Sequence, residues 1–155
     1  MSGGNQQLQE LSQRIEEVES RRQALESQVE TLQARRAEVG EAIDAIENLE
    51  TGSTVQVPIG GSAYVRATIE DIDEIIVGIG GGYATERESE EATELLAERQ
   101  DQLEDRIEEL GEEIAELETE EQELNQRAQQ LQAQQMQQAQ GGGGLGGLGG
   151  GGDDE

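Results

Sequence analysis

The residues of this chain that could take part in catalysis or metal binding are almost all carboxylates. The sequence has 36 acidic residues and ten arginines, but no histidine, cysteine or lysine. Nucleophile–base pairs and thiolate or imidazole metal sites need those missing residue types. Catalytic carboxylate pairs need two different environments, and the glutamate-rich run at 108–123 would lie uniformly in water. We therefore predict that the chain is not an enzyme and uses no cofactor and no metal ion.

Two short motifs resemble ligand-binding loops, but each lacks residues that such a loop needs. The sequence GIGGGYATE at 78–86 is rich in glycine, but a phosphate loop of the Walker type also needs a lysine. The sequence EDIDE at 70–74 lacks the glycine and the distal glutamate of a calcium loop. We predict a hairpin turn at the first motif and a solvated connection at the second.

The charge balance restricts the partners of the chain. A formal net charge of −26 repels nucleic acid and anionic membranes, so we predict neither as a partner. The same charge repels itself in dilute buffer, and salt shortens the screening length from about 10 Å at 0.1 M to about 3 Å at 1 M. This pattern favours a salt-rich cytoplasm like that of haloarchaea. The first ten residues do not resemble a secretory signal, and no window is apolar enough for a membrane span, which also predicts a cytoplasmic protein.

The first half of the chain has the seven-residue repeat of a coiled coil. We predict a helix over residues 5–50 because apolar residues recur at steps of three and four from Leu8 to Ile46. Arg22 and Arg36 interrupt this seam. Their stems can pack along the seam while their charged heads reach water, or the two charges can restrict which helix pairs with this one.

The second half has a similar repeat followed by a glycine-rich end. We predict a helix over 86–138, where a leucine recurs every seven residues from Leu96 to Leu131. Helices this long need a partner helix for stability. Residues 139–155 are predicted to form a disordered, acidic tail because glycine at such density does not fold.

The two predicted helices should fold back on each other as an antiparallel pair, and two registers are possible. In one, the numbers of paired residues add to about 139, and aliphatic residues stack, as Ile15 does on Leu124. In the other, they add to about 132, and Leu11 lies against Glu121. The second register brings two oppositely charged pairs together, Arg14 with Glu120 and Arg21 with Glu113. Burying an aliphatic side chain contributes about 1.5–3 kcal/mol, whereas an exposed ion pair contributes about 0–1 kcal/mol. We therefore predict the first register.

The insert at 51–85 has the two-residue period of β-strands instead. Glycine pairs and triplets separate its apolar runs and suit tight turns, so we predict two β-hairpins. Hairpins this short bury too little to stand alone, and their edges carry unpaired backbone groups. We predict that they oligomerise into a β-barrel through Val55, Val57, Ile59, Tyr64, Val65, Ile69, Ile75, Ile76, Val77 and Ile79. The fold class is thus mainly α, a long antiparallel coiled-coil hairpin with a two-hairpin β insert (α+β).

The order of these segments resembles the alpha subunit of archaeal prefoldin, a chaperone also called GimC. The resemblance rests on VQVPIGGSAYVRATI and DEIIVGIGGGYATE between two coils, and it extends over nearly the whole chain except the glycine-rich end. It implies a hexamer of two alpha and four prefoldin beta subunits, with the coils projecting from a double barrel. It also implies an ATP-independent holdase whose tips capture unfolded protein clients and pass them to a group II chaperonin.

The ends of the two helices are the candidate client-binding site. Coiled-coil ends fray and expose their apolar seam, and several such tips together would gain affinity by multivalency. The predicted client-binding residues are Leu8, Leu11, Ile15, Leu124, Leu131 and Met136. Each could instead simply complete the seam. The alternative function is a structural coiled-coil scaffold that oligomerises through its strands and binds no client.

Overall fold

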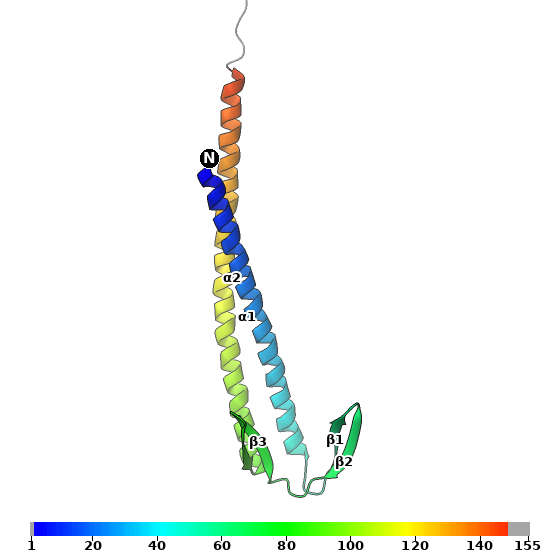
Figure 1. The fold of residues 1–155 in the computed structure, drawn as a ribbon. Helices are drawn as coiled ribbons and strands as arrows, with labels where there is room; N and C mark the ends of the chain where they lie inside the picture. The colour runs from blue at the N-terminus through cyan, green and yellow to red at the C-terminus, as the bar shows by residue number, and fades with distance from the viewer. Residues whose placement is uncertain (1, 149–155) are drawn as a thin grey trace, which may run out of the picture. The chain divides into compact units, whose positions relative to one another are not determined.

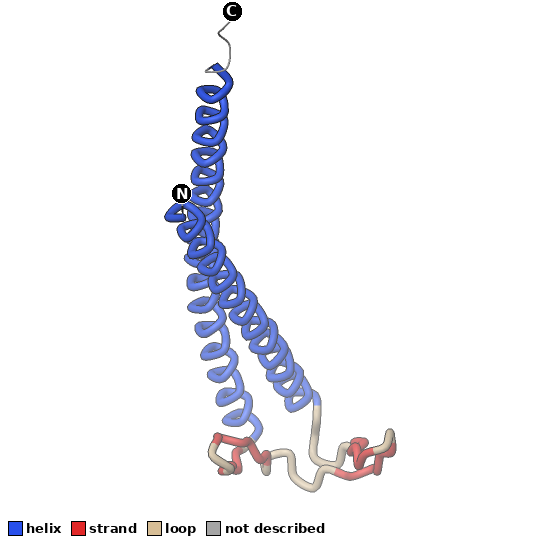
Figure 2. Tube along the Cα trace, turned by 45° about the horizontal axis from the view of Figure 1, so that its top comes forward, coloured by secondary structure: helices blue, strands red, loops and turns tan. Residues whose placement is uncertain are grey.

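The computed structural model describes residues 2–148, which form two long helices with four strands between them (Figure 1). Helix α1 spans Ser2–Asn48 and helix α2 spans Ser89–Leu148. The strands are β1 (Thr54–Gly60), β2 (Ala63–Thr68), β3 (Ile75–Gly80) and β4 (Tyr83–Arg87). Figure 2 shows the same succession of helix, strands and helix along the chain. This element order confirms the predicted fold class.

The boundaries of the helices differ from the prediction chiefly at the end of α2. The helix ends at Leu148, ten residues beyond the predicted 138, and residues 149–155 of the predicted tail lie outside the described residues. Residues 132–140 are glutamine, alanine and one methionine, all good helix formers, so nothing in this stretch ends the helix at 138. Each glycine beyond that point costs about 1 kcal/mol relative to alanine. The last turns are therefore the least stable part of α2.

None of the described helices carries a stretch that is long and apolar enough to cross a lipid bilayer.

The structure divides into two compact units. Among the described residues, the first contains 2–28 and 110–148, and the second contains 29–109.

In the first unit, α1 and α2 run antiparallel and share a thin apolar seam. Its buried residues are Val18, Leu25, Leu110 and Leu124, of which Leu110 is 1% exposed. Ion pairs cross the seam on its borders: Arg14 Nη2 lies 2.6 Å from Glu120 Oε1, Arg21 Nη2 lies 3.1 Å from Glu113 Oε1, and Arg22 Nε lies 3.1 Å from Glu121 Oε2. A seam with so few buried residues is what the low apolar content of the sequence allows.

The pairing of the helices agrees with the register that stacks aliphatic residues. Leu11 lines the same groove as Leu124 and Leu131. The residue numbers of these two pairs add to 135 and 142, and the mean of the two sums is about 139. Glu121, which the competing register sets against Leu11, binds Arg22 instead.

The assumption that the two ion pairs belong only to the competing register was wrong. Arg14–Glu120 and Arg21–Glu113 both form here, although each pair of numbers adds to 134. The difference of five residues from 139 is about 7.5 Å of helix rise, which an arginine and a glutamate side chain together can cover.

In the second unit, the strands pair as two separate antiparallel hairpins, β1 with β2 and β3 with β4. Both close through the predicted glycine turns, with Gly60 at φ 107° and Gly80 at φ 100°, a conformation that glycine adopts without the steric cost of a Cβ. The register shifts just before each turn, at Ile59 and at Ile79. Such bulges bend the strand and increase its twist.

The second hairpin is attached to the helices of its unit. Val77, Ala92 and Leu96 form a buried cluster, and the partly buried residues around it are Val39, Ala42, Ile43, Ile46, Ile75 and Leu95. Arg99 on α2 donates a hydrogen bond of 2.6 Å to the carbonyl oxygen of Gly78 on β3. Ser89, at the start of α2, donates from its hydroxyl to Asp73 Oδ1, 3.2 Å away. The β3–β4 hairpin is thus held by its own chain.

Candidate functional site

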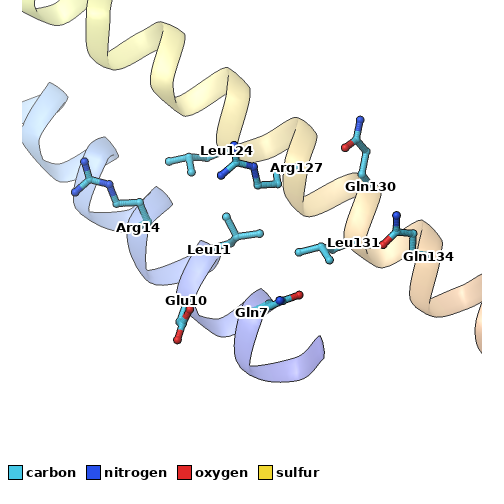
Figure 3. Close-up of a pocket in the computed structure, with 9 residues that line it drawn as sticks. All are labelled: Gln7, Glu10, Leu11, Arg14, Leu124, Arg127, Gln130, Leu131 and Gln134. Atoms are coloured by element: carbon cyan, nitrogen blue, oxygen red, sulfur yellow. The ribbon is translucent and has the colours of Figure 1, made fainter. Parts of the chain in front are cut away.

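Three of the six predicted client-binding residues line a groove between α1 and α2 in the first unit. The groove has a volume of about 630 Å³, and its lining residues come from both helices: Gln7, Glu10, Leu11, Arg14, Leu124, Arg127, Gln130, Leu131 and Gln134. Figure 3 shows Leu11 of α1 directed towards α2, between Leu124 and Leu131. Three of the six predicted residues therefore meet at one place.

The other predicted tip residues lie outside this lining. Leu8 and Ile15 are half-buried, as Leu11 and Leu131 are. Met136 on α2 is 68% exposed. Leu124, at 9% exposed, is the most buried of the set. A gradient of burial thus runs along α2 from Leu124 to Met136.

The groove is lined by polar residues that the prediction did not include. Three of them are glutamines, Gln7, Gln130 and Gln134, and each carries both donors and an acceptor of hydrogen bonds. They stand beside seam positions, where long polar side chains border the apolar stripe of a coiled coil. Their position on the heptad could have indicated them, but the prediction considered only apolar residues.

The charged residues of the groove lining are more balanced than those of the chain as a whole. Its lining holds one carboxylate, Glu10, and two guanidinium groups, Arg14 and Arg127, so its formal charge is +1, whereas that of the chain is −26. The hydrogen bond that Arg14 donates to Glu120 raises the pKa of the guanidinium, and the attraction of the same carboxylate adds to this. Arg14 is therefore already neutralised by its neighbours, including Glu17 at 3.4 Å.

Arg127 differs from most arginines of the chain. Six of the ten form ion pairs: Arg14, Arg21, Arg22, Arg36, Arg87 and Arg106. Within residues 2–148, Arg127 forms no ion pair and no side-chain hydrogen bond. The groove thus contains a cation that the one carboxylate of its lining, Glu10, leaves unpaired.

A second candidate surface lies on the strands of the other unit. Apolar side chains stand in water on both hairpins: Val57 (41% exposed), Ile59 (64%), Tyr64 (60%), Val65 (45%), Ile76 (74%), Ile79 (55%) and Tyr83 (73%). All but Tyr83 were predicted as oligomerisation residues. Large exposed apolar patches on a single chain mark interaction surfaces.

The remaining predicted strand residues are more covered. Val55, Ile69 and Ile75 are half-buried, and Val77 is 6% exposed. Ile76 and Val77 show the alternation of a strand, in which neighbouring side chains point to opposite faces. One face of β3 therefore packs on the helices of its unit, and the other is open.

A chain built from an antiparallel helical pair with two β-hairpins at the connection belongs to the class of coiled-coil subunits with a strand insert. The family model described as prefoldin subunit matches residues 4–134. The prefoldin alpha subunit of Haloarcula marismortui is 52% identical over 114 residues, which cover 74% of each chain. That of Halorubrum lacusprofundi is 51% identical over 112 residues, which cover 72% of this chain and 74% of the relative.

A more distant alpha subunit and a solved structure also match the chain. The prefoldin alpha subunit of Pyrococcus horikoshii is 31% identical over 136 residues, which cover 85% of this chain and 92% of the relative. A solved structure of filamentous PFD from Methanocaldococcus jannaschii matches with a TM-score of 0.49 and 26% identity, over 76% of this chain and 93% of that one.

The chain belongs to the prefoldin family. Its similarity to alpha subunits of Haloarcula and Halorubrum confirms the resemblance predicted from the two hairpin sequences and from the acidic composition. Prefoldin subunits are chaperone components, so the chain has the role of a prefoldin chaperone subunit.

Proposed function

We propose that this chain is the alpha-type subunit of a cytoplasmic prefoldin hexamer that holds unfolded proteins without ATP and passes them to a group II chaperonin. The observation that carries client holding is the groove near the start of α1, where Leu11, Leu124 and Leu131 face one another in an open space of about 630 Å³. An apolar floor open to water can accept aliphatic side chains that a folded client would bury.

Assembly takes place through the strands in this proposal. The exposed residues of the β1–β2 hairpin and of the open face of β3 bury their apolar surface against strands of other subunits. The edges of the two-stranded sheets gain backbone hydrogen bonds at the same time. Val77, which the helices already cover, contributes indirectly, because it holds β3 in place for these contacts.

The hexamer compensates for the weakness of each tip. One groove with a few leucines and glutamines binds a short peptide weakly, but several grooves on one assembly act together on one client. The proposed stoichiometry, two alpha with four beta subunits, supplies six such tips.

The experiment removes the tips and leaves the strands. A variant without residues 1–14 and 125–155, mixed with a prefoldin beta subunit in molar KCl, should assemble but no longer suppress the aggregation of an unfolded client. The matched control places aspartate at Ile59 and Ile76 in the full-length chain, and should fail to assemble. If the trimmed variant suppressed aggregation as well as the full chain, the proposed site would be wrong.

The alternative is a structural scaffold whose tips bind nothing. It is favoured by the fact that Leu124 is 9% exposed and thus mostly serves the seam. The same experiment separates the two functions, because a scaffold would assemble and never suppress aggregation, with or without its tips.

A further inference from the structure

Two guanidinium groups line the groove, and one of them forms no ion pair within the described part of the chain. Arg127 lines the groove beside Leu124 and Leu131, and it forms no ion pair within residues 2–148. The sequence has 36 carboxylate side chains for ten arginines. An arginine left unpaired in such a composition is available to an external carboxylate, with which a guanidinium can form two parallel hydrogen bonds.

The other lining residues suit the backbone and side chain of a peptide. Gln7 on α1 and Gln130 and Gln134 on α2 can each donate to a peptide carbonyl oxygen and accept from a peptide N–H. The three leucines of the groove suit an aliphatic side chain. Together these groups match a peptide that carries an aliphatic residue next to a carboxylate.

We propose that Arg127 makes the groove selective for unfolded segments in which aspartate or glutamate neighbours an aliphatic residue. This inference rests on the proposed client site and adds its substrate class. The pairing of the two guanidinium groups supports it, because Arg14 already binds Glu120 whereas Arg127 forms no ion pair within residues 2–148. In molar salt the screening length is about 3 Å, so the distant negative charge of the chain no longer repels an acidic peptide, whereas direct contact with Arg127 persists.

The test measures the binding of labelled peptides to the assembled hexamer in molar KCl by fluorescence anisotropy. One peptide carries leucines flanked by aspartates, and the other has asparagine at each aspartate. We expect the acidic peptide to bind about three- to tenfold more tightly, which is the range for a charge-assisted contact of about 0.7–1.4 kcal/mol. In Arg127→Gln this preference should disappear, so that the acidic and the asparagine peptide bind with equal affinity.

Arg106→Gln is the matched control. Arg106 lies on the same helix and pairs with Glu109 at 3.0 Å rather than lining the groove, so its loss changes the net charge equally and should leave the preference intact. If Arg106→Gln abolished the preference as Arg127→Gln does, only the overall charge would matter and the proposal would be wrong.

Three further outcomes would also overturn it. If both peptides bound the natural hexamer equally, Arg127 would have no selective role, although the groove would still bind clients. If the preference appeared only after deletion of residues 149–155, which contain the acidic end of the chain, Arg127 would serve that end rather than a client. If neither peptide bound at all, the proposed client site itself would fail.

Discussion

Truncation of Leu110 should destabilise the helical pair much more than truncation of Leu131. Leu110 is 1% exposed, so Leu110→Ala removes three buried carbon atoms. At about 0.8 kcal/mol for each, this loss is about 2.4 kcal/mol, and the remaining cavity brings it into the range of about 2–5 kcal/mol. For a chain of this size, each kcal/mol lowers the melting temperature by about 2–4 °C. We therefore expect a decrease of roughly 6–12 °C for a cost of about 3 kcal/mol.

Leu131→Ala is the matched change at the groove. Leu131 is half-buried and lines the open groove, so its truncation removes fewer buried contacts and we expect a loss below about 1 kcal/mol. Melting curves of the assembled hexamer by far-ultraviolet circular dichroism in molar KCl would measure both variants. For client binding we expect the opposite order. At low temperature, Leu131→Ala should bind an unfolded client less tightly than Leu110→Ala does. Equal decreases in melting temperature would refute the reasoning, because the groove would then be packed as tightly as the middle of the seam.

Three further predictions concern the ion pairs, the strands and salt. The side chains of Arg22 and Glu121 are 21% and 18% exposed and lie 3.1 Å apart. Arg22→Leu alone should therefore destabilise the helical pair more than Arg22→Leu with Glu121→Leu, because the single variant leaves a half-buried carboxylate without this partner. Melting curves would show the opposite order if this ion pair mattered little. Ile76 is 74% exposed, so Ile76→Asp should keep the helicity of the chain and abolish assembly in sedimentation. The control Glu74→Gln should change neither helicity nor assembly. If Ile76→Asp still assembled, the strand interface would be contradicted. The melting temperature should rise from dilute buffer to molar KCl because salt screens a net charge of −26, and a higher melting temperature in dilute buffer would contradict this.

The sequence was most informative where a local rule determines the structure. Glycine pairs and triplets predicted both turns, and Gly60 and Gly80 indeed have positive φ. The heptad pattern predicted both helices, because only an apolar stripe at this period gives a helix a partner. The choice of register also followed from burial, since Leu11 lies in the groove with Leu124 and Leu131.

The sequence was less informative where the length of side chains or tertiary packing determines which residues are in contact. Arg14 and Glu120 were assigned to one register only, because the prediction compared residue numbers and not the length of the side chains. Nothing in the alternation of β3 indicated that Val77 packs on Ala92 while Ile76 stays in water. The position of Arg127 in the groove lining was missed because an arginine outside the apolar seam has no signal of its own.

The central claim is that the exposed strands join this chain to other subunits and leave the tips available to clients. Sedimentation of the purified chain in molar KCl, alone and mixed with a prefoldin beta subunit, tests it most directly. We predict a complex with the mass of two alpha and four beta subunits. A chain that remained a folded monomer in the presence of the beta subunit would contradict the account.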